Sequence, residues 1–389
     1  MLNDLTLISL TKKLISLPSY VDKAQNEIPV TDFLVKLLET ALPEMTITKQ
    51  YVNNSRRYNL IVTGVSKPKL FVIGHVDTVQ PKEGWKTNPL KPVVQQGRLL
   101  GLGAADMKGS LAAFLWALLS VKQTIATNEL MLLLYVDEEY DFKGINCFLQ
   151  DDAVCRINPR LTLSLDGALA VSAGCRGLIE ISLRIKGRSG HSSNPKNGVN
   201  AITQTLLAYQ KLEDELNGLN NPILGPTTSN LAYLQGGVTR TENVVPLWDG
   251  QGNVIPDTVD LVLEVRPSVQ GIDGQFILGR FKKYLQDQKL KIEDPIIRHD
   301  IAPWANSPDK QSLEILRGAY RKAGVPFKVA KQLYTGYVDV EMVARKIATP
   351  TYVIGAGGFN RHGANEYVLI NQLEQATCLY REILKEMLS

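Results

Sequence analysis

Four short apolar segments, each followed within eight residues by histidine or an acidic side chain, constrain this chain more than any other feature. The segments are 69–73, 130–136, 161–165 and 351–354. Uninterrupted apolar runs of this length are typical of strands that are buried on both faces. Helical patterns, such as the one at 107–122, lie between them. The alternation predicts an α/β fold with a mainly parallel sheet and helices on both faces.

The polar residues at the ends of these segments form a candidate metal site. Open α/β sheets bind their ligands at the ends of the strands. The candidates are His75 and Asp77, Asp106, Glu138 and Glu139, Asp166 and His362. Imidazole and carboxylate ligands without sulfur favour zinc, with cobalt or manganese as alternatives, in a hydrolytic centre. If Asp106 is shared, each of two divalent metal ions receives one histidine and one further carboxylate.

Five motifs occur in one order along the chain. They are Gly-His-x-Asp-x-Val at 74–79, Asp-Met-Lys-Gly at 106–109, Asp-Glu-Glu at 137–139, Gly-x-Ser-Gly-His-Ser-Ser at 187–193 and His-Gly-Ala-Asn-Glu at 362–366. In this combination the chain resembles the zinc-dependent amidohydrolase and exopeptidase family. That family includes acetylornithine deacetylase, succinyl-diaminopimelate desuccinylase, aminoacylase, carnosine dipeptidases and glutamate-releasing carboxypeptidases.

The resemblance implies a role for each candidate. His75 and Asp166 hold one metal ion, Glu139 and His362 hold the other, and Asp106 bridges the two. Asp77 orients His75, Glu138 is the general base, and the peptide bond between Asp106 and Met107 is cis. Adjacent side chains of an extended strand end point apart, which predicts that Glu138 is not itself a ligand.

The chain has 389 residues, which is more than one hydrophobic core usually serves. The α/β pattern gives way to strict alternation at 178–185, followed by a helix at 199–216, strands at 229–234 and 259–265 and a helix at 275–288. We therefore expect a catalytic domain in two parts, 1–176 and 297–389, interrupted by a small α+β domain at 177–296. The resemblance implies that this insert acts as a lid and forms a homodimer. An N-terminal helix capped by Asn3 or Asp4 ends at Pro18.

Further candidates follow from the resemblance. His191 is expected to stabilise the oxyanion, in dimeric relatives from the other subunit. Arg176 and Arg266 match arginines that bind a substrate carboxylate, a task suited to the planar guanidinium fork. Asn243 and Asn253 both fit one asparagine motif of the site, and the sequence leaves open which is equivalent. Thr335 and Gly336 resemble a loop that lines the substrate pocket.

The substrate class stays open. Asp166 is the residue that aminopeptidases and dipeptidases tend to have, whereas deacylases and carboxypeptidases of the family tend to have Glu there. We expect a small-molecule substrate, an N-acyl amino acid of the acetylornithine type, with a dipeptide or other short peptide as the alternative. A metal-stabilised scaffold without activity would usually have lost the base or a ligand. A nucleotide-binding protein is excluded because no glycine-rich phosphate loop follows the first strand.

Composition excludes other partners. The net charge of +4 is too small to predict nucleic-acid binding. The longest apolar run, at 111–119, is too short for a membrane span. The four cysteines form no CxxC motif, which indicates reduced thiols and a cytoplasmic protein.

Overall fold

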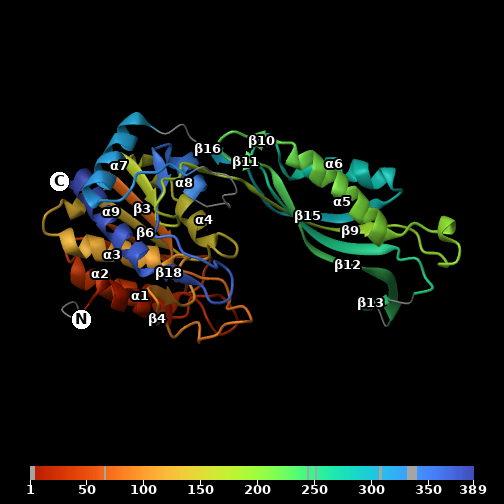
Figure 1. Cartoon of the computed structure of the whole chain (residues 1–389), viewed down its shortest axis with the longest axis horizontal. Helices are drawn as coiled ribbons and strands as arrows, with labels where there is room; N and C mark the ends of the chain where they lie inside the picture. Colours follow the sequence, from red (N-terminus) through yellow and green to blue (C-terminus); the bar gives the residue numbers. More distant parts are fainter. Residues whose placement is uncertain (1–4, 65–66, 243–244, 250–251, 306–308, 331–339) are drawn as a thin grey trace. The chain divides into compact units, whose positions relative to one another are not determined.

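A computed structural model describes residues 5–64, 67–242, 245–249, 252–305, 309–330 and 340–389. The chain divides into two compact units (Figure 1). The described residues of the first unit fall within Met1–Ala173, Ser307–Ala330 and Val338–Ser389, and those of the second fall within Gly174–Asn306. Each unit has its own hydrophobic core.

The first unit is built on a six-stranded sheet. Its strand order is β1 (Thr46–Tyr51), β2 (Tyr58–Thr63), β6 (Leu130–Tyr135), β3 (Leu70–His75), β7 (Leu161–Ser164) and β17 (Thr351–Val353). The four strands β6, β3, β7 and β17 are parallel, and β2 joins β6 antiparallel. Every residue of β3 and β6 is buried. The predicted fold class is confirmed, and these four strands coincide with the four apolar segments.

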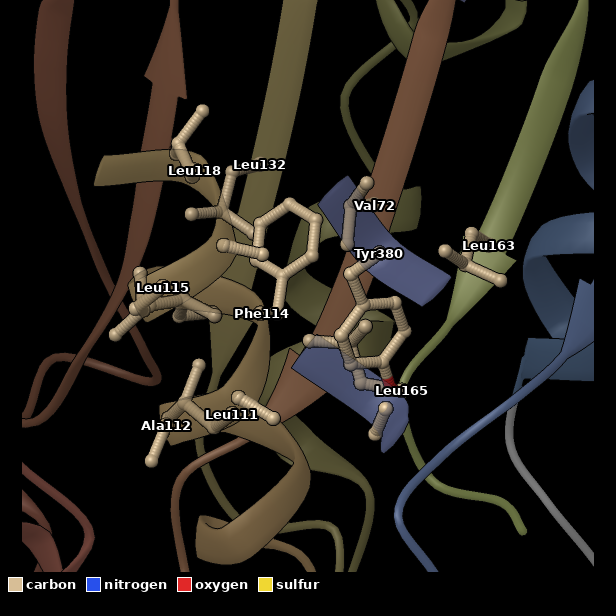
Figure 2. Packing of buried hydrophobic residues seen from close by; sticks show 14 of the residues in the cluster. Val72, Leu111, Ala112, Phe114, Leu115, Leu118, Leu132, Leu163, Leu165 and Tyr380 are labelled. Carbon is tan, nitrogen blue, oxygen red and sulfur yellow. The ribbon is translucent and has the colours of Figure 1, made fainter. Parts of the chain in front are cut away.

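Helices cover both faces of this sheet. Phe71 and Val72 are neighbours in β3, so their side chains point to opposite faces. The ring of Phe71 packs against that of Phe148 of α4 (Lys143–Leu149), with the ring centroids 5.8 Å apart and the planes tilted by 35°. On the other face, Val72 lies against Phe114 and Tyr380 (Figure 2). These two rings come from α3 (Lys108–Val121) and α9 (Ile370–Leu388), which run side by side.

The other elements of the first unit complete its core. They are α1 (Leu7–Ser16), α2 (Ile28–Ala41), α7 (Lys310–Ala323), α8 (Val340–Ile347) and a small sheet ordered β18 (Tyr367–Leu369), β5 (Arg98–Leu100), β4 (Val93–Gln95). The predicted cap of α1 was wrong: Thr6 caps it, with Ser9, in a reciprocal capping box, and the helix ends before Pro18. None of the described helices combines the length and the apolar character that a membrane crossing needs.

The second unit is an antiparallel sheet with two helices. Its strand order is β13 (Val245–Asp249), β12 (Thr228–Glu242), β14 (Thr258–Arg266), β9 (Leu178–Lys186) and β15 (Lys291–Ile301). Residues of β9 and β14 alternate between buried and half-buried, and their buried face packs with α5 (Ala201–Asn217) and α6 (Gly274–Asp287). Two short pairings complete the unit: β10 (Asn220–Asn221) with β11 (Gly225–Pro226), and β8 (Gly174–Cys175) with β16 (Trp304–Ala305).

The edge strand of the second unit runs further than the sequence pattern indicated. β15 stays paired with β9 as far as Ile301, beyond residue 296, at which the sequence interpretation ended the insert. The backbone ladder holds residues 297–301 in this sheet, although their side chains alternate weakly between half-buried and exposed. Because the side chains of this edge strand differ little in burial, the sequence pattern does not show where the strand ends.

Candidate metal centre

The carboxyl ends of the parallel strands bring the predicted ligands together. His75 is the last residue of β3, and Glu138 and Glu139 follow β6. Asp166 follows β7, and His362 lies in the loop between β17 and β18. Asp106 stands two residues before the start of α3 and is joined to Met107 by a cis peptide bond, as predicted. All these residues belong to the first unit.

Two groups of side chains share Asp106. In one, ligand atoms of His75, Asp106 and Asp166 lie within 4.8 Å of one another, and in the other those of Asp106, Glu139 and His362 do. The Nε2 atoms of His75 and His362 each lie 3.3 Å from Asp106, on Oδ1 and Oδ2 respectively. His362 Nε2 is also 3.0 Å from Glu139 Oε2. The two oxygens of Asp106 therefore face two different histidines, the arrangement that a bridging carboxylate requires.

Asp77 lies behind His75. Its backbone oxygen is 3.2 Å and its Oδ1 is 3.5 Å from His75 Nδ1, which leaves Nε2 turned towards Asp106. The other oxygen, Oδ2, accepts a 2.9 Å hydrogen bond from the N–H of Glu139. Asp77 thus links the ends of β3 and β6. Holding the far nitrogen of a ligand histidine in this way fixes its ring orientation.

The turn after β6 is not extended, so the expectation that Glu138 and Glu139 point apart was wrong. Asp137 adopts a left-handed backbone conformation with φ of 69°. As a result, carboxylate oxygens of both Glu138 and Glu139 lie within 4.8 Å of a His75 nitrogen. The left-handed residue breaks the alternation of side-chain directions that a strand would impose. Both carboxylates therefore border the same space.

The side chains present fit divalent metal ions. Glu139 is nearly buried, yet within the described part of the chain its Oε1 has no hydrogen-bond partner. A buried carboxylate oxygen without a partner is costly unless a cation or an ordered water satisfies it. The donor set of imidazole nitrogens and carboxylate oxygens is also the one that zinc, cobalt and manganese accept in hydrolytic sites.

Among the protein groups alone, the cluster holds its histidines protonated. Hydrogen bonds to Asp106 and Glu139 raise the pKa of His362 to about 10. Burial opposes the protonation of His75, but hydrogen bonds to Asp106 and Asp77 outweigh it and raise the pKa of that imidazole. Burial raises the pKa of Asp166 and of Glu139. The candidate ligands thus concentrate negative charge. Without metal ions, protons bound to the histidines and carboxylates balance part of that charge.

Glycines of the motifs let the ligand loops pack closely. A Cβ on Gly74 would lie 2.7 Å from the Cε of Met107, so the end of the Met107 side chain would have to move. A Cβ on Gly109 would lie 2.3 Å from the backbone oxygen of Ala104. The glycines of these two motifs are explained by close approach at the start of α3.

Two residues that the sequence interpretation did not select flank His362. Glu366 is buried and accepts hydrogen bonds from the backbone N–H groups of Gly103, Ala105 and Asp106. Arg361 Nη1 lies 2.9 Å from Asp166 Oδ1 and 3.8 Å from Asp106 Oδ2. Both stand in the segment Arg361-His362-Gly363-Ala364-Asn365-Glu366. Their charge and their closeness to His362 in the sequence would have been reason to select them as candidates.

A buried ion cluster supports the turn that carries Glu138. The guanidinium of Arg57 pairs with Glu27 and with Asp137, and its Nε donates a 2.7 Å hydrogen bond to Glu27. Glu27 and Asp137 are fully buried. Asn59, also buried, accepts from the N–H of Val136 at 3.2 Å and donates to the backbone oxygen of Gly144 at 2.8 Å. The sequence holds no signal for this cluster, because its members come from separate elements.

The other predicted site residues belong to the second unit or lie outside the described residues. Asn243, Thr335 and Gly336 lie outside them. Asn253 is exposed, and its backbone oxygen accepts a 2.9 Å hydrogen bond from the N–H of Ser192. The nearly buried Arg176 donates to Thr228 Oγ1 at 2.8 Å.

His191 and Arg266 have well-defined local partners. His191 is exposed, and its Nδ1 accepts a 3.2 Å hydrogen bond from the N–H of Ser193. A neutral imidazole that accepts at Nδ1 carries its proton on Nε2. Arg266 binds Glu264 through two hydrogen bonds of 2.9 and 3.0 Å. The guanidinium fork of Arg266 is therefore already matched to a carboxylate of the chain.

Known proteins share both sequence and fold with this chain. Over 246 residues it is 32% identical to the acetylornithine deacetylase of Proteus mirabilis, an alignment that covers 60% of this chain and 62% of that protein. It is 29% identical to the succinyl-diaminopimelate desuccinylase of Shewanella piezotolerans over 84% of each chain. A crystal structure of a tripeptidase from Staphylococcus aureus superposes with a TM-score of 0.76 at 20% identity, over 97% of each chain.

The family model described as peptidase family M20/M25/M40 matches residues 71–386. This range includes every candidate ligand and most of both units. The resemblance predicted from the five motifs is confirmed by this match. The chain belongs to peptidase family M20/M25/M40 and is a metal-dependent hydrolase of amide or peptide bonds.

Proposed function

We propose that this protein removes the acyl group from an N-acyl amino acid, with two divalent metal ions as cofactors. The sharing of Asp106 between two histidines carries the two-metal assignment. His75 and Asp166 would hold one ion, Glu139 and His362 the other, and Asp106 both, with zinc as the native metal and cobalt or manganese as alternatives. When bound, such ions polarise the scissile carbonyl and acidify water. The acyl specificity is supported by the two relatives that act on N-acyl compounds.

Glu138 is the proposed general base. Its carboxylate borders the space between the ligand groups, within 4.8 Å of ligand atoms of His75 and Glu139. There it takes the proton of the attacking water and passes it to the amine that leaves. The Glu27–Arg57–Asp137 cluster holds the turn on which Glu138 stands.

Residues of the second unit complete the proposal. His191 stabilises the oxyanion through Nε2, which its bond from Ser193 leaves as the proton donor. Arg176 and Arg266 bind the substrate carboxylate, and Arg266 must exchange Glu264 for it. Asn243 or Asn253 and the loop with Thr335 and Gly336 line the pocket. The second unit forms a homodimer, which the exposed Leu206 and Leu207 of α5 support. The free thiols of Cys147, Cys155 and Cys378 support a cytoplasmic location.

A substrate screen tests this function. The metal-loaded protein is assayed against N-acetyl amino acids, N-succinyl amino acids and dipeptides, with the Glu138→Gln variant as the control for contaminating hydrolases. We expect the highest kcat/KM on an N-acyl amino acid with a free carboxylate. A preference for dipeptides would favour the second candidate, a metallopeptidase for short peptides, which Asp166 supports because peptidases of the family tend to have aspartate there.

A further inference from the structure

Arg361 is a cation that contacts two of the candidate ligand carboxylates. Its Nη1 donates to Asp166 Oδ1 at 2.9 Å and lies 3.8 Å from Asp106 Oδ2, and its Nη2 donates to the backbone oxygen of Gly167 at 3.3 Å. About a third of the side chain is exposed. An arginine stays protonated in proteins, so this positive charge cannot be removed by titration.

The contacts of Arg361 make the two ligand groups unequal. Each group has one histidine and one oxygen of Asp106. The direct contact of Arg361 Nη1, at 2.9 Å, is with Asp166, whereas the Asp106 oxygen that faces His362 lies 3.8 Å away. The remaining carboxylates differ. Asp166 is already bound by a guanidinium, whereas Oε1 of Glu139 has no hydrogen-bond partner among the described residues. An ion that enters beside Asp166 must displace the guanidinium and is repelled by it, whereas an ion beside Glu139 meets a vacant acceptor.

We propose that Arg361 is a built-in counter-ion that sets the order of metal binding. It weakens the His75–Asp106–Asp166 group, so that the Asp106–Glu139–His362 group fills first and the second ion binds less tightly. The inference rests on the two-metal assignment made above. It adds a residue that touches a ligand and tunes affinity without being a ligand itself.

A calorimetric titration of the metal-free full-length protein with Zn²⁺ tests the proposal without an activity assay. The parent protein should take up two ions in two separate steps. Arg361→Gln should tighten the weaker step by at least about ten-fold and the stronger step by clearly less, because the guanidinium touches Asp166 directly but lies further from Asp106. Arg361→Lys, which keeps the charge, should keep the separation between the steps. Arg321→Gln, on the exposed side of α7, is the matched control for loss of one positive charge and should behave as the parent.

Two ligand variants assign the steps, and circular dichroism verifies that each variant is folded. Asp166→Asn should abolish the weaker step, and Glu139→Gln the stronger one. Loss of the stronger step in Asp166→Asn, or equal tightening in Arg361→Gln and Arg361→Lys, would overturn the role of Arg361. If the parent binds one ion and Arg361→Gln binds two, the proposal holds, and Arg361 weakens the second site so far that it stays empty in the parent. If the parent and Arg361→Gln both bind one ion, or neither binds any, the two-metal assignment fails and the proposal fails with it.

Discussion

The backbone N–H of Asp106 donates a 3.0 Å hydrogen bond to the carboxylate of Glu366, so the proposed bridging ligand is anchored by a residue four positions after His362. The same carboxylate binds the N–H groups of Gly103 and Ala105 at 2.8 and 2.7 Å. Burial raises the pKa of Glu366 to about 7, while these three donors favour its ionised form. One side chain therefore holds the loop that enters α3.

Replacing Glu366 with Gln should weaken metal binding. The amide of Gln has one acceptor oxygen, so its NH₂ group would face one of the three N–H donors. An unsatisfied buried donor costs roughly 1–3 kcal/mol, and the loop can avoid that cost only by moving Asp106. We expect Glu366→Gln to bind less metal at limiting free Zn²⁺, measured by elemental analysis after dialysis. Glu374→Gln, on the exposed side of α9, should retain the parent's metal content. Unchanged metal content in Glu366→Gln would show that the clamp does not control the ligand.

Glu138→Gln should separate catalysis from metal binding. The substitution keeps the size of the side chain but removes the base, so kcat should fall by roughly 10²–10⁴ while both ions stay bound. Steady-state kinetics and metal analysis on the same sample check this. Loss of metal together with activity would instead make Glu138 a ligand. Its carboxylate lies close enough to His75 for that role.

Metal uptake should release protons at neutral pH. The pKa of His362 is raised to about 10 and that of His75 is raised too, so both rings are protonated at pH 7 without metal. Ligation needs neutral rings, so binding of both ions should release about two protons per chain. Metal affinity should accordingly rise as the pH increases from 7 towards 10. Calorimetry in buffers of different ionisation enthalpy measures the release. Uptake without proton release would show that the rings are neutral beforehand.

Arg57→Met should strongly destabilise the first unit. It leaves the buried carboxylates of Glu27 and Asp137 without their cation, a change that costs roughly 3–5 kcal/mol at pH 7. Urea unfolding gives the loss. Arg56→Met changes the exposed neighbour and serves as the control, because it removes the same charge from the surface. A similar loss in both variants would mean that the cluster contributes nothing specific.

Lys108 should make stability depend on pH. Burial lowers its pKa to about 7 from an ordinary value of 10.5, although Glu366 and Asp77 oppose the shift. Between pH 7 and about 10.5 the unfolded chain therefore binds more protons than the folded one, and this residue makes stability rise with pH. The loss of folding stability that comes from burying the charged ammonium of Lys108 is complete below pH 7 and absent above about pH 10.5. Lys108 Nζ also donates to the backbone oxygen of Leu17 at 2.8 Å, a bond that any replacement loses.

The melting temperature of Lys108→Met, relative to the parent, should therefore be most favourable near pH 6 and decline by several degrees towards pH 10. Thermal unfolding followed by circular dichroism across this range measures the difference. Lys36→Met, at an exposed position of α2, is the control and should show a difference that does not change with pH. A constant difference for Lys108→Met would mean that Lys108 titrates in the same range in both states.

The sequence by itself determined the central sheet, the family and the set of candidate ligands. Uninterrupted apolar runs identify strands that are covered on both faces, and polar residues at their ends must meet at one edge of a parallel sheet. The candidate ligands could therefore be expected to cluster, whereas the pairing of His75 with Asp166 rested on the resemblance to the family. The helix α3 was equally clear, because nearly all of its residues are apolar or small and buried.

Only the tertiary structure decided how these residues are held. The left-handed backbone of Asp137, which aims two adjacent carboxylates at one histidine, has no signature in a run of three acids. Arg361 on Asp166, Glu366 on the Asp106 loop and Arg57 between two buried carboxylates join side chains far apart in the chain. Periodicity reports which face of an element is buried, whereas ion pairs and backbone clamps depend on which elements meet, and long-range packing alone sets that.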